Sequence, residues 1–229
     1  MPLSNPGRTP PLNTSVTVGA EVGCGDRLLC QVSTASAQRQ AVVEFIQQRF
    51  ESAYGARPSL RVPQLLALTN ASGDLQAAVG VREAGRERLF LEDYLPAPVE
   101  TLVPNHDAIP RHRIVEVAHL AGVEPGVSRF LFPLLTVWLM ARGVQWIAFT
   151  GTEQLRNSFE RLGIPAHVLL PADPACLPDG GAGWGRYYEH GPKVMVANVP
   201  LGFEALRHVG LLRRVRVLSA PEGLYERTA

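Results

Sequence analysis

One stretch of the sequence, residues 114–163, limits most strongly what this chain can fold into. Its first apolar run, Ile114–Val123, passes through a Gly/Pro/Ser segment into a run with helical periodicity, and a second apolar run follows at Val144–Thr150. A short helix-like segment comes next and ends at Gly163. Short apolar runs between turn residues are typical of buried strands, so the stretch predicts a strand–loop–helix–strand–helix unit. A loop that leads from a strand into a helix suits a phosphate or thioester ligand.

Further helices and strands are predicted around this unit. Helical spacing predicts one helix between a capping Ser36 and Gly55 and a second near residues 203–208. Short apolar runs predict strands at residues 28–32, 65–69, 75–81 and 166–170. Gly80, inside one of these runs, indicates a bulge or a close approach of the backbone. The order of elements predicts an α+β fold with one twisted, mostly antiparallel sheet flanked by helices and a local parallel pair where a helix crosses over.

The length of 229 residues suits one domain of generous size. Residues 1–26 are rich in Pro, Gly, Ser, Thr and Asn, a composition that does not bury enough apolar surface to order itself. We therefore expect a flexible N-terminal tail over residues 1–26 and a single domain over residues 27–229.

Composition and charge exclude several classes of protein. The net charge of +1 gives no general attraction to nucleic acid, and the arginines near the C-terminus are interpreted as a solvated edge. Cys24, Cys30 and Cys176 have no metal-binding spacing, so they are expected to be free thiols in a reducing compartment, and no metal site is predicted. No secretory signal is recognisable, and the longest apolar run, Phe130–Ala141, is too short to span a bilayer. A soluble, cytoplasmic protein is the expectation.

Two polar residues, Glu116 and His119, interrupt the first apolar run of the central unit. Their odd spacing would place them on opposite faces of a regular strand, whereas a bulge between them would bring them to one face, and bulges are common beside active sites. Either group could accept a proton from an amine nucleophile. The alternative is structural: Glu116 paired with a neighbouring arginine, and His119 as a hydrogen-bonded histidine of the core.

The loop after this strand contains candidate ligand-binding residues. Gly126 allows a positive φ or a close ligand approach, Ser128 is a plausible N-cap, and Arg129 could add positive charge. Pro133 predicts that the regular part of the helix starts only there. Asn157, on the following short helix, could reach a ligand or could lie in solvent.

Several segments resemble the thermostable hemolysin family of bacteria. They include FIQQRFESAYG, FLEDYLPAPVE, IVEVAHLAG, GVQWIAFTGTEQLRNSFERLGIP, PADPACLP and GWGRYYEHGPKVMVANV, and the likeness extends from about residue 38 to about residue 208. The family itself resembles a branch of the GNAT N-acyltransferase superfamily, near the autoinducer synthases and the N-acyl amino acid synthases. The resemblance implies a GNAT-like fold. The loop from Glu124 to Arg129 is reduced relative to the superfamily pattern, and His119 stands where those synthases carry an arginine.

The resemblance implies an N-acyltransferase that moves an acyl group from a thioester to a small amine or amino-acid-like acceptor. Acyl-CoA or an acyl carrier protein would be the donor, with no permanently bound cofactor and no nucleic acid partner. The implied catalytic residues are Glu116, His119 and Tyr188. The thioester would lie in a V-shaped gap between the two central strands, along Leu120, Ala121, Gly122, Val123, Gly126, Ser128, Arg129 and Asn157. The acceptor pocket would comprise Glu92, Trp184 and Tyr187.

Two other functions remain open from the sequence. The chain could be a membrane-active or lipid-binding protein without catalysis, which would use Phe130–Phe132 or Leu211–Arg214 at a membrane surface without spanning it. It could also be a regulatory module that kept the fold and lost the chemistry.

Overall fold

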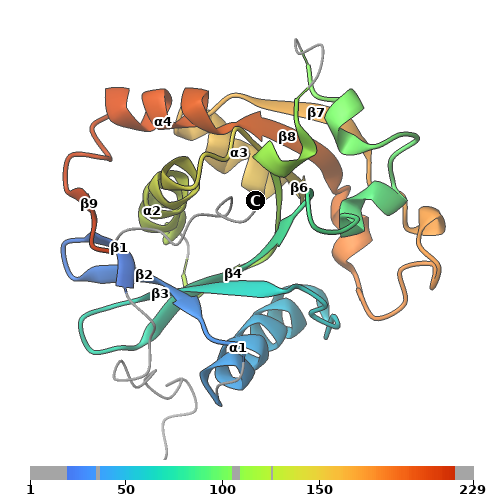
Figure 1. Ribbon diagram of the computed structural model, residues 1–229. Coiled ribbons are helices and arrows are strands. Elements are labelled where there is room, and N and C mark those ends of the chain that lie inside the picture. Colours follow the sequence, from blue (N-terminus) through green and yellow to red (C-terminus); the bar gives the residue numbers. More distant parts are fainter. Residues whose placement is uncertain (1–19, 35–36, 105–108, 125, 220–229) are drawn as a thin grey trace, which may run out of the picture.

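The computed structural model describes residues 20–34, 37–104, 109–124 and 126–219 (Figure 1). Its strands form one nine-stranded sheet in the order β7-β8-β6-β5-β4-β3-β2-β1-β9. The strands are β1 Ala20–Cys24, β2 Arg27–Val32, β3 Gln64–Thr69, β4 Leu75–Glu83, β5 Ile114–Gly122, β6 Trp146–Gly151, β7 Ala166–Pro171, β8 Lys193–Asn198 and β9 Val215–Val217. Among the described strand pairs only β5 and β6 run parallel. The predicted α+β fold is therefore confirmed.

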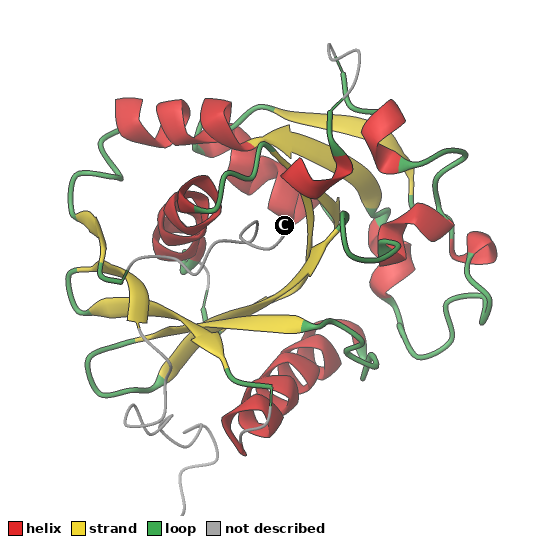
Figure 2. Ribbon diagram, in the orientation of Figure 1, coloured by secondary structure: helices red, strands yellow, loops and turns green. Residues whose placement is uncertain are grey.

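Four α-helices of the described chain cover the sheet (Figure 2). They are α1 Ala37–Tyr54, α2 Ser128–Ala141, α3 Glu153–Arg161 and α4 Val199–His208. Alternate residues of β3 face opposite sides: Leu66 and Leu68 pack in one core cluster with α2, whereas Leu65 and Ala67 pack in another with α1. The described residues contain no helix long and apolar enough to cross a membrane.

A third core cluster lies over β6 and β8, where short 3-10 turns take the place of a helix. Leu89, Leu91 and Val99 pack there against Trp146 and Val196. The turns are η2 Phe90–Asp93 and η3 Val99–Thr101. This segment of 3-10 turns packs beside the central strands. The contacts that attach it to the sheet therefore help to position the residues of the site.

Several expectations about boundaries need correction. The N-terminal tail does not extend to residue 26, because Ala20–Cys24 pairs with β2 on one side and with β9 on the other; the rest of the predicted tail, residues 1–19, lies outside the described residues, as does the predicted cap Ser36. The helix α2 begins at Ser128 with Val127 as its N-cap, so Ser128 is not the cap. It also runs through Pro133 instead of starting there. Pro133 falls close enough to the N-terminus that few helical hydrogen bonds are lost.

Of the two possibilities for β5, a regular strand or a bulge, the structure has a bulge, which lies at His119 and Leu120. Ala118 pairs with Gly80 and Ala121 pairs with Ala78, so two residues of β5 stand opposite one residue of β4. His119 has a φ of 53°, a left-handed conformation that is uncommon for residues other than glycine. The extra residue turns the second half of β5 relative to the first.

The predicted divergence of the two central strands is also present. The parallel ladder between β5 and β6 consists of Ile114 with Trp146, Val115 with Ile147 and Glu116 with Ala148, although both strands continue beyond it. Beyond these three pairs the two strands are no longer paired with each other. A V-shaped gap therefore opens in the middle of the sheet.

Gly80 on β4 is needed because a neighbouring side chain occupies the space of a Cβ atom. A Cβ built there would lie 2.8 Å from Cγ2 and 3.0 Å from Cγ1 of Val62. We expect Gly80→Ala to lower the free energy of unfolding by about 1–3 kcal/mol through overpacking. In a double variant with Val62→Ala the two clashing methyl groups are gone and only the Cβ atom of residue 62 remains, at 3.2 Å. The loss of stability in the double variant should therefore be smaller than the sum of the losses in the two single variants. Urea unfolding of the four proteins measures this, and strictly additive costs would contradict the steric explanation.

Candidate active site

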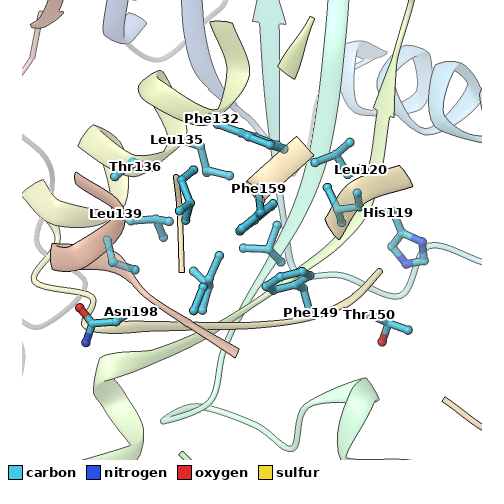
Figure 3. A pocket seen from close by; sticks show the side chains of 17 residues that line it. His119, Leu120, Phe132, Leu135, Thr136, Leu139, Phe149, Thr150, Phe159 and Asn198 are labelled. Atoms are coloured by element: carbon cyan, nitrogen blue, oxygen red, sulfur yellow. The ribbon is translucent and has the colours of Figure 1, made fainter. Parts of the chain in front are cut away.

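Two cavities meet at the gap between β5 and β6. One is a narrow apolar pocket between the sheet and α2, α3 and α4, with a water-accessible volume of about 60 Å³. The other is a wide open cleft on the side of α1, with a water-accessible volume of about 880 Å³. Five residues line both cavities: His119, Leu120, Phe132, Thr150 and Leu155. Figure 3 shows the apolar pocket, with His119 and Thr150 near one end and Asn198 near the other.

His119 is the titratable residue among those five. Its ring stacks on Trp184 with the planes 8° apart and the centroids 5.8 Å apart, and its edge contacts Phe50. Its Nδ1 atom is buried without a hydrogen-bond partner in the described structure. A buried polar atom without a partner is uncommon and is often explained by a ligand, a water or a catalytic role.

The environment of His119 keeps its imidazole neutral. Burial, and secondly the positive charge of Arg82, lower the pKa of His119 to about 4. The residue therefore offers an uncharged ring nitrogen at neutral pH. A neutral imidazole at the junction of an apolar pocket and an open cleft can accept a proton from a bound nucleophile.

Glu116 is buried and holds another segment in place. Its Oε2 accepts a hydrogen bond from the amide of Phe90 at 2.9 Å, and its Oε1 accepts one from the amide of Leu91 at 3.0 Å. Arg82 lies 3.8 Å from Oε2, so the alternative expectation of an arginine pair is confirmed. Burial raises the pKa of Glu116, and these two amides and Arg82 oppose the rise. The carboxylate lines the open cleft, but both of its oxygens are already engaged in fixing η2.

Glu92 is placed differently from the expectation. It is buried and bound by both terminal nitrogens of Arg111, at 2.6 and 2.7 Å, and it accepts amide hydrogen bonds from Leu89 and Val99. Burial favours a higher pKa for Glu92, but the hydrogen bonds from Arg111 and the two amides lower it on balance. Glu92 lines neither cavity. Glu92 forms a buried ion pair with Arg111, so the structure does not bring it to the open cleft together with Trp184 and Tyr187.

Aromatic side chains line the open cleft next to His119. Trp184 and Tyr187 line the cleft as expected, together with Phe50, Tyr54, Phe90 and Tyr94. Tyr188 does not line it, but its hydroxyl lies 2.6 Å from that of Tyr94. Burial raises the pKa of Tyr94, Tyr187 and Tyr188, so all three hydroxyls are protonated at neutral pH. Sequence reasoning missed Tyr94, Phe50 and Arg82, because no spacing in the chain connects them to β5.

The end of α1 positions the segment that carries Trp184. The amide of Arg186 donates to the carbonyl of Tyr54 at 2.8 Å. Gly185 has a φ of 51° and lies so close to the carbonyls of Tyr54 and Gly55 that a Cβ atom would not fit. This contact brings Trp184 over His119, although the two residues are far apart in the sequence.

The expected thioester-binding residues divide into two groups. Leu120, Ala121, Gly122, Gly126 and Ser128 line the open cleft, and Gly126 has the expected positive φ of 98°. The others line neither cavity: Arg129 and Asn157 are exposed to solvent, and Val123 donates its amide to the carbonyl of Gln76 at 2.9 Å.

Successive amides of a strand alternate in direction, so the Val123 hydrogen bond turns the Gly122 amide away from β4 and toward the gap. At this end of β5 the amide of Gly122 is therefore oriented toward a ligand in the gap.

Solved structures of similar fold include three synthases. FeeM, an N-acyl amino acid synthase from uncultured soil microbes, matches with a TM-score of 0.52 and 15% identity over 76% of this chain and 91% of its own. The AHL synthase LasI matches with a TM-score of 0.51 and 12% identity over 79% and 91% of the two chains. BjaI, a CoA-dependent acyl-homoserine lactone synthase with SAM and isopentyl-CoA, matches with a TM-score of 0.50 and 11% identity over 78% and 87%. At these identities the likeness shows the fold.

The order of the strands and the open gap between β5 and β6 thus belong to a GNAT-like fold. More narrowly, the chain belongs to the thermostable hemolysin family, whose profile matches residues 32–203. No curated protein matches the chain.

The engagement of Glu116 predicts a loss of stability when one of its oxygens is replaced. In Glu116→Gln the amide nitrogen would face a backbone N–H, so one buried donor would lose its acceptor. We expect the free energy of unfolding to fall by about 1–3 kcal/mol. The matched change Glu204→Gln, in an exposed ion pair, should cost less than about 0.5 kcal/mol. Equal effects of the two substitutions in chemical denaturation would contradict this role of Glu116.

The lowered pKa of His119 predicts a specific pH dependence of stability. In the unfolded chain the His119 imidazole binds a proton below its ordinary pKa of about 6.5, whereas in the folded chain it binds that proton only near pH 4. Stability should therefore fall as the pH falls from about 6.5 to 4, by on the order of 3 kcal/mol from this residue alone. His119→Asn, which tolerates the left-handed conformation, should lack this part of the slope. Unfolding free energies of both proteins across this pH range test it, and parallel curves would contradict it.

Proposed function

We propose that this protein transfers an acyl group from a thioester to an amine. The observation that carries the proposal is the meeting of an apolar pocket and an open cleft at His119. A reaction that joins an apolar acyl chain to a polar acceptor needs one site with both environments, and its reacting atoms have to lie where the two meet. The synthase names of the solved structures with similar fold support the same reaction class.

The two substrates would enter from opposite sides of the sheet. The acyl chain would lie in the apolar pocket, along Phe149, Phe159 and Leu135. The thioester and its pantetheine arm would occupy the gap beside β5, where the ladder with β6 has ended. The amine would lie in the open cleft, against Trp184 and Tyr187. Acyl-CoA and an acyl carrier protein both present this arm, and both are proposed as donor classes.

The chemical step would use His119 as the proton acceptor. The amine nitrogen attacks the carbonyl carbon, a C–N bond forms, and the carbonyl oxygen gains negative charge that the Gly122 amide can stabilise. An imidazole nitrogen of His119 takes the proton that the amine loses. The C–S bond then breaks and the sulfur receives the proton, so an amide and a free thiol leave. Glu116 fixes η2 and thereby Phe90 and Tyr94. In this proposal it contributes by positioning rather than by taking the proton.

Thiol release measures this reaction directly. The purified full-length protein is incubated with acyl-CoA or acyl-carrier thioesters and a panel of amines and amino acids, and free thiol is followed with a chromogenic disulfide. We expect amine-dependent thiol release that falls by about 10²–10⁴-fold in His119→Asn, because a general base is lost. The matched control is His167→Asn, the same replacement at an exposed residue outside both cavities. No thiol release with any donor and amine, or a fully active His119→Asn protein that is folded, would overturn the proposal.

A further inference from the structure

We propose that the C-terminal rim of this protein docks on the surface of an anionic membrane. The name C-terminal rim stands for residues 201–218, which contain most of α4, the turn after it, and β9. In Figure 1 this segment runs along one side of the molecule, from α4 down to β9. The proposal is independent of acyl transfer and concerns a surface that lines no part of the open cleft.

Apolar side chains are unusually exposed along the rim. The described residues include six strongly exposed large apolar side chains, and four of these are Leu201, Val209, Val217 and Leu218. Each leaves half or more of its surface in water: 54%, 51%, 50% and 51%, respectively. Single exposed apolar residues are normal, but four of the six lie in this one segment of the chain, beside its arginines.

The same segment holds an excess of positive charge. It contains four arginines (Arg207, Arg213, Arg214 and Arg216) and a single acidic residue, Glu204, which gives a net charge of +3 with histidine neutral. The whole chain carries only +1, so all other residues together carry −2. All four arginines are exposed. Glu204 is paired with Arg207 at 2.5 Å, which leaves Arg213, Arg214 and Arg216 as a basic group next to Val217 and Leu218.

A lipid surface satisfies both features at once. Arginines bind lipid phosphates at the level of the headgroups, while exposed aliphatic side chains enter the boundary of the acyl region. A nucleic acid would pair with the arginines but would leave the four aliphatic side chains in water. An acidic thioester carrier would need to deliver its arm to the open cleft, and no residue of the rim lines that cleft. The partner favoured by this combination is therefore an anionic bilayer.

Binding to vesicles tests the proposal with the full-length protein. Co-sedimentation is measured with vesicles of phosphatidylglycerol and phosphatidylcholine and with vesicles of phosphatidylcholine alone. We expect at least about tenfold tighter binding to the anionic vesicles, since each arginine near such a surface adds attraction. The preference should shrink as salt is raised, because exposed charges are screened.

Two rim variants separate the charge from the apolar contribution. Arg213→Glu with Arg214→Glu should weaken binding to anionic vesicles at least about tenfold, and Val217→Ser with Leu218→Ser should weaken it at least about threefold. Arg57→Glu with Arg86→Glu makes the same change in net charge at exposed positions outside the rim and should leave binding nearly unchanged. Circular dichroism and the unfolding midpoint show whether each variant folds.

Three results would overturn the proposal. The first is the absence of any preference for anionic vesicles at low salt. The second is that the folded rim variants bind anionic vesicles as tightly as the Arg57/Arg86 control variant does. The third is rim-dependent binding to single-stranded RNA or to an acidic carrier protein without binding to vesicles.

Discussion

The early end of the hydrogen-bond ladder between β5 and β6 is the constraint on which the site depends. A sheet that stayed paired along both strands would close the space where the apolar pocket meets the open cleft. The bulge at His119 accompanies this divergence, because one extra residue in β5 increases the local twist against β4. The left-handed conformation of His119 costs on the order of 1–3 kcal/mol, and the surrounding pairing has to maintain it.

Two buried carboxylates support this gap from one side. Glu116 accepts the amides of Phe90 and Leu91, and Glu92 accepts those of Leu89 and Val99 while Arg111 neutralises its charge. Buried carboxylates are costly without partners, and here the partners are backbone amides at the N-terminal ends of η2 and η3, which have no carbonyl acceptor within those turns. The segment thereby receives a fixed position over β6 and β8. That position places aromatic rings of the segment in the cleft wall.

The local elements could be predicted from the sequence, whereas the assembly of the site could not. Strands β3 and β4 and the central strand–helix–strand unit followed from hydrophobic periodicity, because that signal is local. The polar interruption at Glu116 and His119 indicated a bulge only as one of two possibilities. The role of Glu116 depends on amides of η2, and that of Glu92 depends on Arg111 and the amide of Val99. No periodicity reveals these distances in space. Similarly, Tyr94 and Phe50 reach the cleft only through tertiary packing. The β1 strand was missed because a Gly- and Val-containing pentapeptide has little local signal, and pairing with β2 and β9 makes it a strand.

The contact between Trp184 and His119 also has an optical consequence. The chain contains three tryptophans, and Trp138 and Trp146 are only 0% and 3% exposed in the core. Trp184 alone of the three lines the open cleft, where its indole stacks on an imidazole. A molecule that enters between these rings changes the polarity around one indole and leaves the other two as a constant background. Intrinsic fluorescence of the unmodified protein is therefore a selective reporter of occupancy at this position in the cleft.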